Sequence, residues 1–480
     1  MDETHPSLDE LSTLGRIAKA EGRYGEALAH CKAILTKNPT DAMTHANMAG
    51  IYAEVGDWRT ALSLFEKARS LAPHTPRFHD DYLYFLHHAP VSDEDLFAEH
   101  LRYGELFPAE STPLPSRTQT TPKDKIRVGY LTADLHEHAT AFILEPILAA
   151  HDKASFEIFL YSTSALHDHY TESIISCADI YRDCAGESHE QIREQIIADE
   201  LDILIDLGGH TGENNLPVFA HRAAPIQISW FSYMSTSGLK TMDYRFIDEW
   251  RTPRDRVQFY TEKLLYLSNS YTFRAPAELV REQVPVPNPL PALANGYITF
   301  GSFNTSHKIT AEVLDLWAHI LKNTDTSKLL ILIPRSASYE QWLFETFESR
   351  GVERDRILPK KYDTLANLYS YISQTDIALD PFPYTGGATT YHALASGVPS
   401  VTLEGRTEYA RNCAAIMREA GLSDWIARTP NEYSALAQSK SRDLEILSSI
   451  RATAPNSIGT NTQQLVREVE AYFRALAETI

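Results

Sequence analysis

An internal repeat near the N-terminus is the feature that most restricts how this chain can fold. Four positions recur at an offset of 34 residues, where Gly22, Ala27, Leu28 and Pro39 are answered by Gly56, Ala61, Leu62 and Pro73. Leu14 and Cys31 are answered by Met48 and Phe65 at the same offset. A period of this length is typical of a helical hairpin that stacks on copies of itself, because one such unit cannot bury its apolar face alone.

The residue types agree with tetratricopeptide repeats over 8–41 and 42–75, with small residues where helices cross and a proline where the second helix ends. Two repeats are too few for a stable solenoid, so we expect the apolar segment Phe78 to Phe107 to be further helix packed against them. The helical region then spans 1–107. It is either a platform for a protein or peptide partner, or an N-terminal cap or dimer surface, and the sequence leaves both open.

Two α/β halves are predicted after this region. The stretch 108–122 is polar and proline-rich, which is a linker composition. Beyond it, apolar runs alternate with helical stretches, a pattern that predicts parallel sheets covered on both faces; the runs lie at 126–131, 156–161, 203–207, 226–230, 298–303, 329–333, 377–379 and 400–403. A second proline-rich break at 285–291 separates two doubly wound halves, 123–290 and 291–480, and a helix over 462–478 closes the second half.

Composition argues against several classes of function. The chain has 44 basic and 64 acidic residues and a formal net charge of −20, whereas binding to nucleic acid or to anionic membranes needs clustered Lys and Arg. The four cysteines are scattered without metal-type pairing and look like reduced cytosolic thiols. The acidic start is unlike a signal peptide, and no apolar stretch approaches membrane-spanning length. We therefore expect a cytoplasmic protein without a membrane span.

The motif from Leu379 to Thr390 predicts a strand end, a tight turn and a helix start. Gly386 and Gly387 let the backbone approach a ligand closely, because they carry no Cβ. Thr389 and Thr390 offer hydroxyls beside the first N–H groups of the helix. Such a helix end binds phosphate, since those N–H groups lack helical partners and the helix dipole is positive there. The alternative is an ordinary helix capped by Thr389 or Thr390.

Three more polar clusters follow predicted strands. His136 and His138 could be metal ligands, but no third ligand stands at helical spacing, so a general base or a substrate clamp is favoured. His210 lies in a glycine-rich stretch that is either functional or an ordinary turn. Lys308 can neutralise a diphosphate without a metal, although alone it reads as a surface lysine. The chain has no Gly-x-x-x-x-Gly-Lys loop, which argues against a nucleotide triphosphatase. A Gly-x-Gly-x-x-Gly dinucleotide fingerprint is also missing.

An ordered series of motifs resembles the family of bacterial O-linked N-acetylglucosamine transferases and SPINDLY proteins. The motifs lie at 126–130, 206–212, 222–227, 242–245, 300–304, 379–390 and 397–402, and the resemblance runs from Leu8 to about Leu422. It implies a GT-B fold, which is α/β with two facing doubly wound Rossmann-like halves, preceded by α-helical tetratricopeptide repeats. It also implies inverting, metal-independent transfer of a sugar from a nucleotide diphosphate sugar to Ser or Thr hydroxyls of protein.

The resemblance also implies roles for individual residues. His138, Lys308 and His210 match catalytic positions, and Lys308 matches the lysine that holds the diphosphate of the leaving group. The expected donor- and phosphate-binding residues are Gly386, Gly387, Ala388, Thr389, Thr390, Asn304, Thr305 and His392. Tyr233 and Thr211 are expected on the acceptor side. The resemblance implies neither a metal nor a cofactor, because the nucleotide sugar, with UDP-N-acetylglucosamine as the first expectation, is a substrate.

The chain differs from the family pattern at several of these positions. His392 stands where an acidic residue normally holds the ribose hydroxyls, and a histidine cannot accept two hydrogen bonds as a carboxylate can. Thr305, Thr385, Ala388 and the loop 232–238 also differ. These differences leave open a GDP-fucose or other nucleotide-sugar donor, a glycan or small-molecule acceptor, and a non-catalytic scaffold that binds partners. The sequence is silent on the oligomeric state.

Overall fold

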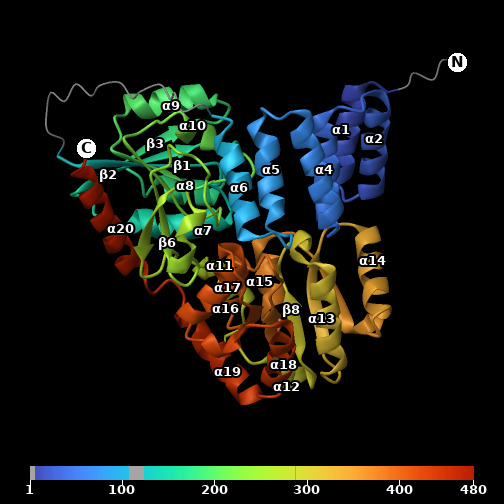
Figure 1. Cartoon of the computed structure of the whole chain (residues 1–480). Helices are drawn as coiled ribbons and strands as arrows, with labels where there is room; N and C mark the ends of the chain where they lie inside the picture. Colours follow the sequence, from blue (N-terminus) through green and yellow to red (C-terminus); the bar gives the residue numbers. More distant parts are fainter. Residues whose placement is uncertain (1–5, 108–123, 287) are drawn as a thin grey trace. The chain divides into compact units, whose positions relative to one another are not determined.

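The computed structural model describes residues 6–107, 124–286 and 288–480 (Figure 1). The chain forms two compact units, each built from two separate stretches. Unit 1 comprises Met1–Pro90 and Pro276–Ser457, and unit 2 comprises Val91–Ala275 and Ile458–Ile480. The predicted linker 108–122 lies outside the described residues.

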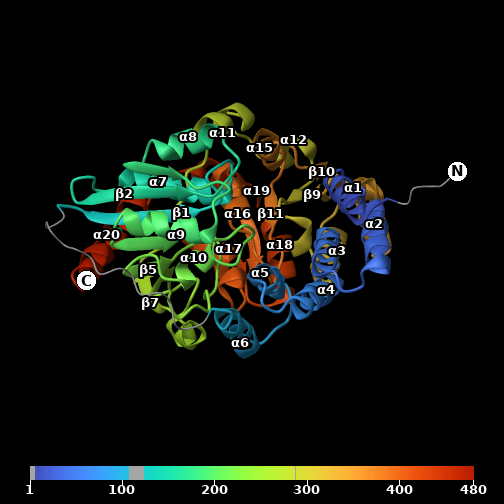
Figure 2. The ribbon, with the colours of Figure 1, turned by 90° about the horizontal axis from the view of Figure 1, so that it is seen from above.

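The N-terminal part of unit 1 is a row of helices, and each predicted repeat is one helix pair. The helices are α1 (Leu8–Ala20), α2 (Tyr24–Lys37), α3 (Ala42–Glu54), α4 (Trp58–Leu71) and α5 (Pro76–Leu86). Figure 2 shows α1 to α4 side by side. Ala27 and Ala61, which recur between the repeats, are fully buried, because only a small side chain fits where the helices pack closely.

The recurring glycines lie in the turns between the helices of each pair. Gly22 and Gly56 have φ values of +72° and +79°, a region that favours glycine. Both turns also touch the α/β part of unit 1. A Cβ on Gly22 would lie 1.9 Å from the carbonyl oxygen of Arg335, and one on Gly56 would lie 3.3 Å from the carbonyl oxygen of Ile309. The repeats therefore pack on the loops that follow two strands of the adjoining sheet.

The rest of unit 1 is a parallel sheet with the strand order β10-β9-β8-β11-β12-β13, which confirms the predicted doubly wound half. Its strands are β8 (Thr299–Ser302), β9 (Lys328–Ile333), β10 (Ile357–Lys361), β11 (Ile377–Leu379), β12 (Ser400–Leu403) and β13 (Ile426–Ala427). Its helices are α11 (Ala277–Gln283), α12 (Pro291–Asn295), α13 (Ala311–Lys322), α14 (Ala337–Glu348), α15 (Leu365–Ser373), α16 (Ala388–Ala395), α17 (Glu408–Glu419), α18 (Pro430–Lys440) and α19 (Leu444–Thr453). Short 3-10 turns are η2 (Ser306–Lys308), η3 (Arg354–Arg356), η4 (Ser423–Trp425) and η5 (Ala454–Asn456).

Unit 2 contains a second parallel sheet with the order β3-β2-β1-β4-β5-β6-β7. Its strands are β1 (Ile126–Thr132), β2 (Phe156–Ser162), β3 (Ile180–Asp183), β4 (Ile203–Asp206), β5 (Ile226–Ser229), β6 (Tyr244–Asp248) and β7 (Lys263–Leu267). The helical elements are α6 (Asp93–Gly104), α7 (Ala139–Ala150), α8 (His169–Ile175), α9 (His189–Ala198), α10 (Leu216–Ala220), η1 (Arg254–Phe259) and α20 (Thr462–Ala477). Strand β4 is buried along its whole length, as its continuous apolar run predicts.

The helical extension after the repeats divides between the two units, whereas the sequence predicted that all of it packs on the repeats. Helix α5 stays with the repeats, but α6 belongs to unit 2. Asp93 of α6 forms an ion pair with Arg256 at 2.7 Å, and a Cβ on Gly104 would lie 2.2 Å from the carbonyl oxygen of Gly238. The apolar pattern predicts a helix at this place but does not identify the surface that covers it.

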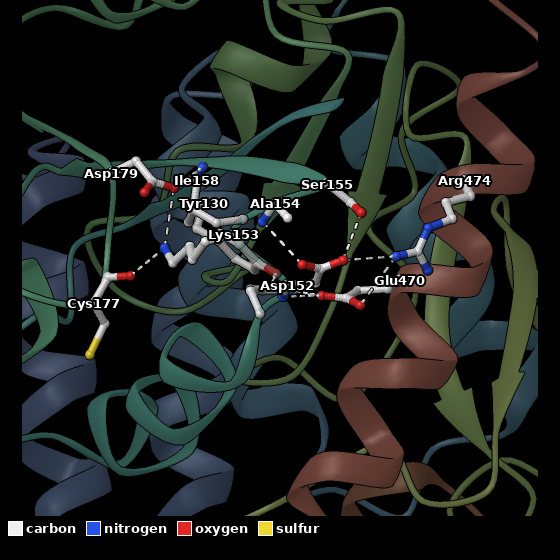
Figure 3. Close-up of polar contacts among 11 residues, drawn as sticks. Tyr130, Asp152, Lys153, Ala154, Ser155, Ile158, Cys177, Asp179, Glu470 and Arg474 are labelled. Carbon is white, nitrogen blue, oxygen red and sulfur yellow. Dashed lines mark hydrogen bonds and ion pairs between the residues drawn. The ribbon is translucent and has the colours of Figure 1, made fainter. Parts of the chain in front are cut away.

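The closing helix α20 differs from its predicted place in the same way, because it packs in unit 2 and not in the C-terminal half. Glu470 accepts a hydrogen bond from the backbone N–H of Asp152 at 2.8 Å (Figure 3). Its carboxylate also lies 3.0 Å from Nδ1 of His151. Arg474 lies 3.5 Å from the carboxylate of Asp152. Phe473 is fully buried beside Phe156. Together these contacts fix the end of the described chain to the sheet of unit 2.

Replacing Gly22 by Ala tests whether the repeat turn is packed against Arg335. We expect Gly22→Ala to lower the free energy of unfolding by the cost of a positive φ and by roughly 1–3 kcal/mol more, because the added Cβ overlaps a carbonyl oxygen. Gly296→Ala is the matched control, since Gly296 has a φ of +73° and open space around its Cβ position. Urea unfolding of both variants measures the difference. Equal destabilisation would show that the contact with Arg335 contributes nothing.

Candidate functional site

The turn after β11 in unit 1 has the geometry of an anion-binding site. Helix α16 begins at Ala388 after Gly387, and no side chain caps it. The capping role considered for Thr389 or Thr390 is therefore absent in the described structure. The N–H groups of Ala388 and Thr389 have no hydrogen-bond partner among the described residues. Free N–H groups at the positive end of a helix are the groups that bind phosphate oxygens.

The neighbouring side chains leave no room for a residue larger than glycine at position 386. A Cβ on Gly386 would lie 2.7 Å from Oγ1 of Thr390 and 2.9 Å from the carboxylate of Asp380. The hydroxyl of Thr389 donates to Oδ1 of Asn304, at 3.2 Å, and thereby links the turn to the loop after β8. The structure thus brings Gly386, Thr389, Thr390 and Asn304 together in unit 1.

Asp380 is a functional candidate that the sequence patterns did not identify. Its buried carboxylate accepts hydrogen bonds from the N–H of Gly386 at 2.7 Å and from the hydroxyl of Thr402 at 2.7 Å. Burial raises the pKa of Asp380 to about 6, and the hydrogen bonds and Lys308 oppose that rise. The signal in the sequence is an aspartate placed directly after a buried strand, where it can orient the turn that follows.

Lys308 ends the 3-10 turn η2 and points at the same turn. Its Nζ donates to the carbonyl oxygen of Thr385 at 3.1 Å and lies 4.1 Å from the ring centroid of Tyr384. Burial lowers the pKa of Lys308 to about 8, while Asp380 and Cys413 act in the opposite direction. Lys308 is therefore a cation with few polar partners, held beside free backbone N–H groups, which is the environment that an anionic ligand would complete.

Two other expected donor residues have different surroundings. Thr305 is exposed, and its hydroxyl lies 3.0 Å from Nε2 of His307. His392 is buried on α16, with Nδ1 2.6 Å from the hydroxyl of Tyr369. Burial lowers the pKa of His392 to about 3, so the ring is neutral. At the position that resembles a ribose contact, this structure thus has the neutral ring of His392, which is hydrogen-bonded to Tyr369 of α15.

In unit 2, His138 is the N-cap of α7. The N–H of Thr140 donates to Nδ1 of His138 at 3.3 Å, so the proton of the neutral ring lies on Nε2. Burial lowers the pKa of His138 and Asp134, 3.6 Å away, opposes this effect. Of the two roles that the sequence left open, this tautomer favours a substrate clamp that donates from Nε2, because a general base needs a free lone pair on the exposed nitrogen.

His210 and Tyr233 lie together in unit 2, inside a buried aromatic cluster. Nε2 of His210 lies 2.9 Å from the carbonyl oxygen of Ser237, and the ring packs against Tyr103 and Tyr233 with centroid distances of 4.4 and 4.9 Å. The hydroxyl of Tyr233 lies 2.8 Å from Nε2 of His100. Burial lowers the pKa of His210 to about 3. Both rings are covered by protein, so they support the loop 232–238 and do not present an atom to solvent.

The remaining expectations concern Thr211, metals and membranes. The hydroxyl of Thr211 donates to the carbonyl oxygen of Gly208 at 2.9 Å and closes the glycine-rich turn. In the part of the chain that the structure describes, no group of three His, Cys, Asp or Glu side chains is arranged to hold a metal ion. Within the same residues, none of the helices combines the length and the apolar character needed to cross a membrane.

Comparison with known families gives two matches to this chain. The model of glycosyl transferase family 41 matches residues 109–282 and 278–472. A tetratricopeptide repeat model matches residues 18–80. The two matches cover the α/β halves and the N-terminal helices that the structure shows.

Individual proteins with known names are similar over most of the chain. A probable UDP-N-acetylglucosamine–peptide N-acetylglucosaminyltransferase SPINDLY of Petunia hybrida is 31% identical over 398 residues, which is 80% of this chain and 42% of that protein. The SPINDLY protein of Arabidopsis thaliana is 32% identical over 368 residues, covering 75% of this chain and 40% of that protein. The chain thus spans less than half the length of these relatives.

A solved structure is similar over almost the whole chain. It is a mutant of the O-GlcNAc transferase of Thermobaculum terrenum, with a TM-score of 0.88 and 29% sequence identity. The match covers 98% of this chain and 91% of that chain.

Replacing Asp380 by Asn tests whether its carboxylate acts on Lys308. We expect the pKa of Lys308 to fall below about 8 in Asp380→Asn, because the negative charge that raises it is removed. The rate of acetylation of Lys308 by acetic anhydride as a function of pH, followed by peptide mass spectrometry, measures this pKa. Asp376→Asn is the control. Asp376 is also a buried carboxylate, but it lies at the other end of β11 and accepts hydrogen bonds from the backbone N–H groups of Thr299 and Ala292. An unchanged pKa of Lys308 in Asp380→Asn would contradict the assigned interaction.

Proposed function

The chain belongs to glycosyl transferase family 41, and we propose that it transfers N-acetylglucosamine from UDP-N-acetylglucosamine to Ser or Thr hydroxyls of proteins. The observation that carries the proposal is the turn 385–389, where free N–H groups and the half-buried cation of Lys308 lie together. The names of the SPINDLY relatives and of the Thermobaculum terrenum transferase support the donor and the acceptor class. We also propose a cytoplasmic location, which agrees with four free cysteine thiols.

In the proposed reaction, the donor diphosphate binds to the N–H groups of Ala388 and Thr389 and to the ammonium group of Lys308. The hydroxyl oxygen of the acceptor attacks the anomeric carbon from the face opposite the diphosphate, so the configuration inverts. The new glycosidic bond forms as the bond to the diphosphate oxygen breaks, and the hydroxyl proton passes to a base or to water. Negative charge then grows on the leaving diphosphate, and fixed N–H groups and a cation stabilise charge most where it develops.

These groups supply the positive charge from the chain itself, so we propose that the reaction needs no metal ion and no cofactor. Lys308 carries a full charge next to the turn, and helix α16 adds the partial charge of its N-terminus. Retained transfer activity in excess EDTA is the expected result. Activity that disappears in EDTA and returns with Mg²⁺ would contradict a metal-independent reaction.

Residues of unit 2 have a supporting part in this proposal. His138 donates from Nε2 to an oxygen of a substrate, in agreement with the tautomer that Thr140 fixes. His210, Tyr233 and Thr211 hold the loops 208–212 and 232–238 in place through buried contacts. We further propose that the helical repeats contact the protein acceptor, because stacked repeats are a common platform for peptide binding.

Replacing Lys308 by Ala tests the leaving-group role. We expect Lys308→Ala to lower the transfer of labelled sugar from UDP-N-acetylglucosamine to protein by about a hundredfold or more, with the fold intact by circular dichroism. Parallel reactions with GDP-fucose and with glycan acceptors identify an alternative donor or acceptor. Near-normal transfer by Lys308→Ala would contradict the role of this lysine. A wild-type protein without transfer to any acceptor would favour the partner-binding scaffold.

The pH dependence of transfer gives a second test of Lys308. Its ammonium form is needed, and its pKa of about 8 lies below the ordinary value of 10.5, so kcat/KM for the donor should fall as the pH rises through about 8. Lys308→Arg is the matched control, because arginine stays charged in this range. Its kcat/KM, whatever its absolute size, should not fall near pH 8. A fall at the same pH in both proteins would assign the titration to another group.

A further inference from the structure

We propose that Tyr84 and His88, at the end of the helical repeat region, are positioning residues for Lys308, and that through them this region sets the rate of sugar transfer. The inference rests on the role of Lys308 proposed above. Tyr84 lies on α5, and His88 follows the end of that helix. Neither residue belongs to the α/β half that carries the lysine, but both lie in the same unit.

The first link is the ring of Tyr384, which lies between the repeat region and the lysine. On one side, Nζ of Lys308 lies 4.1 Å from the centroid of this ring, a distance at which the π face attracts a cation. The hydroxyl of Tyr384 donates to the hydroxyl of Tyr84 at 3.4 Å. The ring of His88 packs on Tyr384 at a centroid distance of 4.7 Å. Tyr84 and His88 therefore limit the rotation and displacement of the ring on which the ammonium group rests.

The second link is His307, the residue before Lys308. Its ring packs edge-on against Phe85 at 5.8 Å and against His88 at 5.2 Å. Because His307 and Lys308 share the short turn η2, fixing the ring of His307 also fixes the backbone from which the lysine side chain starts. Lys308 is thus held at its backbone and at its ammonium end by contacts with the same helix end.

The contacts continue into the second repeat. Phe85 stacks on Phe65 of α4 with centroids 4.8 Å apart and an interplanar angle of 16°. Phe65 is buried and is one of the recurring positions of the repeat. A continuous line of aromatic packing therefore leads from the repeat core through Phe85 to His307. Packed cores of this kind transmit displacement, because they are close-packed and have no slack.

The titratable groups around Lys308 are compatible with this role. The cluster contains Tyr84, Tyr384, Tyr409, His87, His88, His307, Asp380 and Cys413. Burial, followed by the nearby His307 and Lys308, holds the pKa of His88 well below its ordinary value, so the ring is neutral. Nδ1 of His88 donates to the carbonyl oxygen of Phe85 at 3.3 Å. Nε2 is then an acceptor without a partner among the described residues.

The experiment compares Tyr84→Phe, His88→Ala and the control Tyr82→Phe in the full chain. Tyr82 lies on the same helix, and the guanidinium group of Arg69 covers its ring at 4.0 Å. Two quantities are measured: kcat and KM for UDP-N-acetylglucosamine, and the pH midpoint for acetylation of Lys308. The second measurement does not depend on any activity of the enzyme.

We expect Tyr84→Phe to lower kcat about three- to tenfold and His88→Ala about tenfold or more, with a smaller rise in KM. The reason is that Lys308 stabilises the growing charge of the leaving diphosphate more than it stabilises the bound donor. His88→Ala should also raise the acetylation midpoint of Lys308 from about 8 toward 10.5, because water enters the cluster. Tyr82→Phe should change neither quantity.

Unchanged kcat and an unchanged midpoint in both variants would overturn the proposal. If His88→Ala does not fold, Tyr84→Phe decides, because it removes a single hydroxyl and keeps the ring. If the wild-type protein transfers no sugar, the proposed function fails, and the acetylation midpoint of Lys308 still shows whether the helix end positions the lysine.

Discussion

The contact of the half-buried ammonium group of Lys308 with the turn after β11 is the interaction on which the candidate site depends. A cation with one carbonyl and one aromatic face as its direct neighbours is costly to bury, and the low pKa of this lysine records that cost. The same environment makes the lysine a strong partner for an anion, because few other groups compete for its charge. The negative charge of Asp380 favours the charged form of Lys308. Its hydrogen bond to the N–H of Gly386 orients the turn that completes the site.

The N-terminal repeats are part of the unit that holds this lysine. The turn glycines of both repeats lie against loops that follow β9 and β8, and the aromatic end of α5 packs on the turn that carries Lys308. The sequence left the repeats open as a partner platform or a cap. The packing gives the repeat region a structural role as well, since Phe85 and His88 at the end of α5 contact His307 and Tyr384, the residues next to Lys308.

Much of the fold could be predicted from local patterns, because repeat period, apolar alternation and glycine-rich turns act over short distances. The partners of α6 and α20 could not, since an apolar helix face does not name the surface that covers it. The residues of the candidate site likewise fall into those that local patterns predict and those whose surroundings they do not. Lys308, Gly386 and Thr389 follow strand ends and come together, whereas burial of His210 and the bond between His392 and Tyr369 depend on distant residues. Asp380 was visible in the motif but gains its role only from its two hydrogen bonds.

Isothermal titration calorimetry with UDP and with GDP, in the presence of EDTA, measures most directly whether the turn and Lys308 bind a nucleotide diphosphate. We expect one of the two nucleotides to bind the wild-type protein without metal, and to bind Lys308→Ala at least about tenfold more weakly, a difference of about 1.4 kcal/mol. Absence of binding by both nucleotides, or equal affinity of the wild-type protein and Lys308→Ala, would contradict the account of this site.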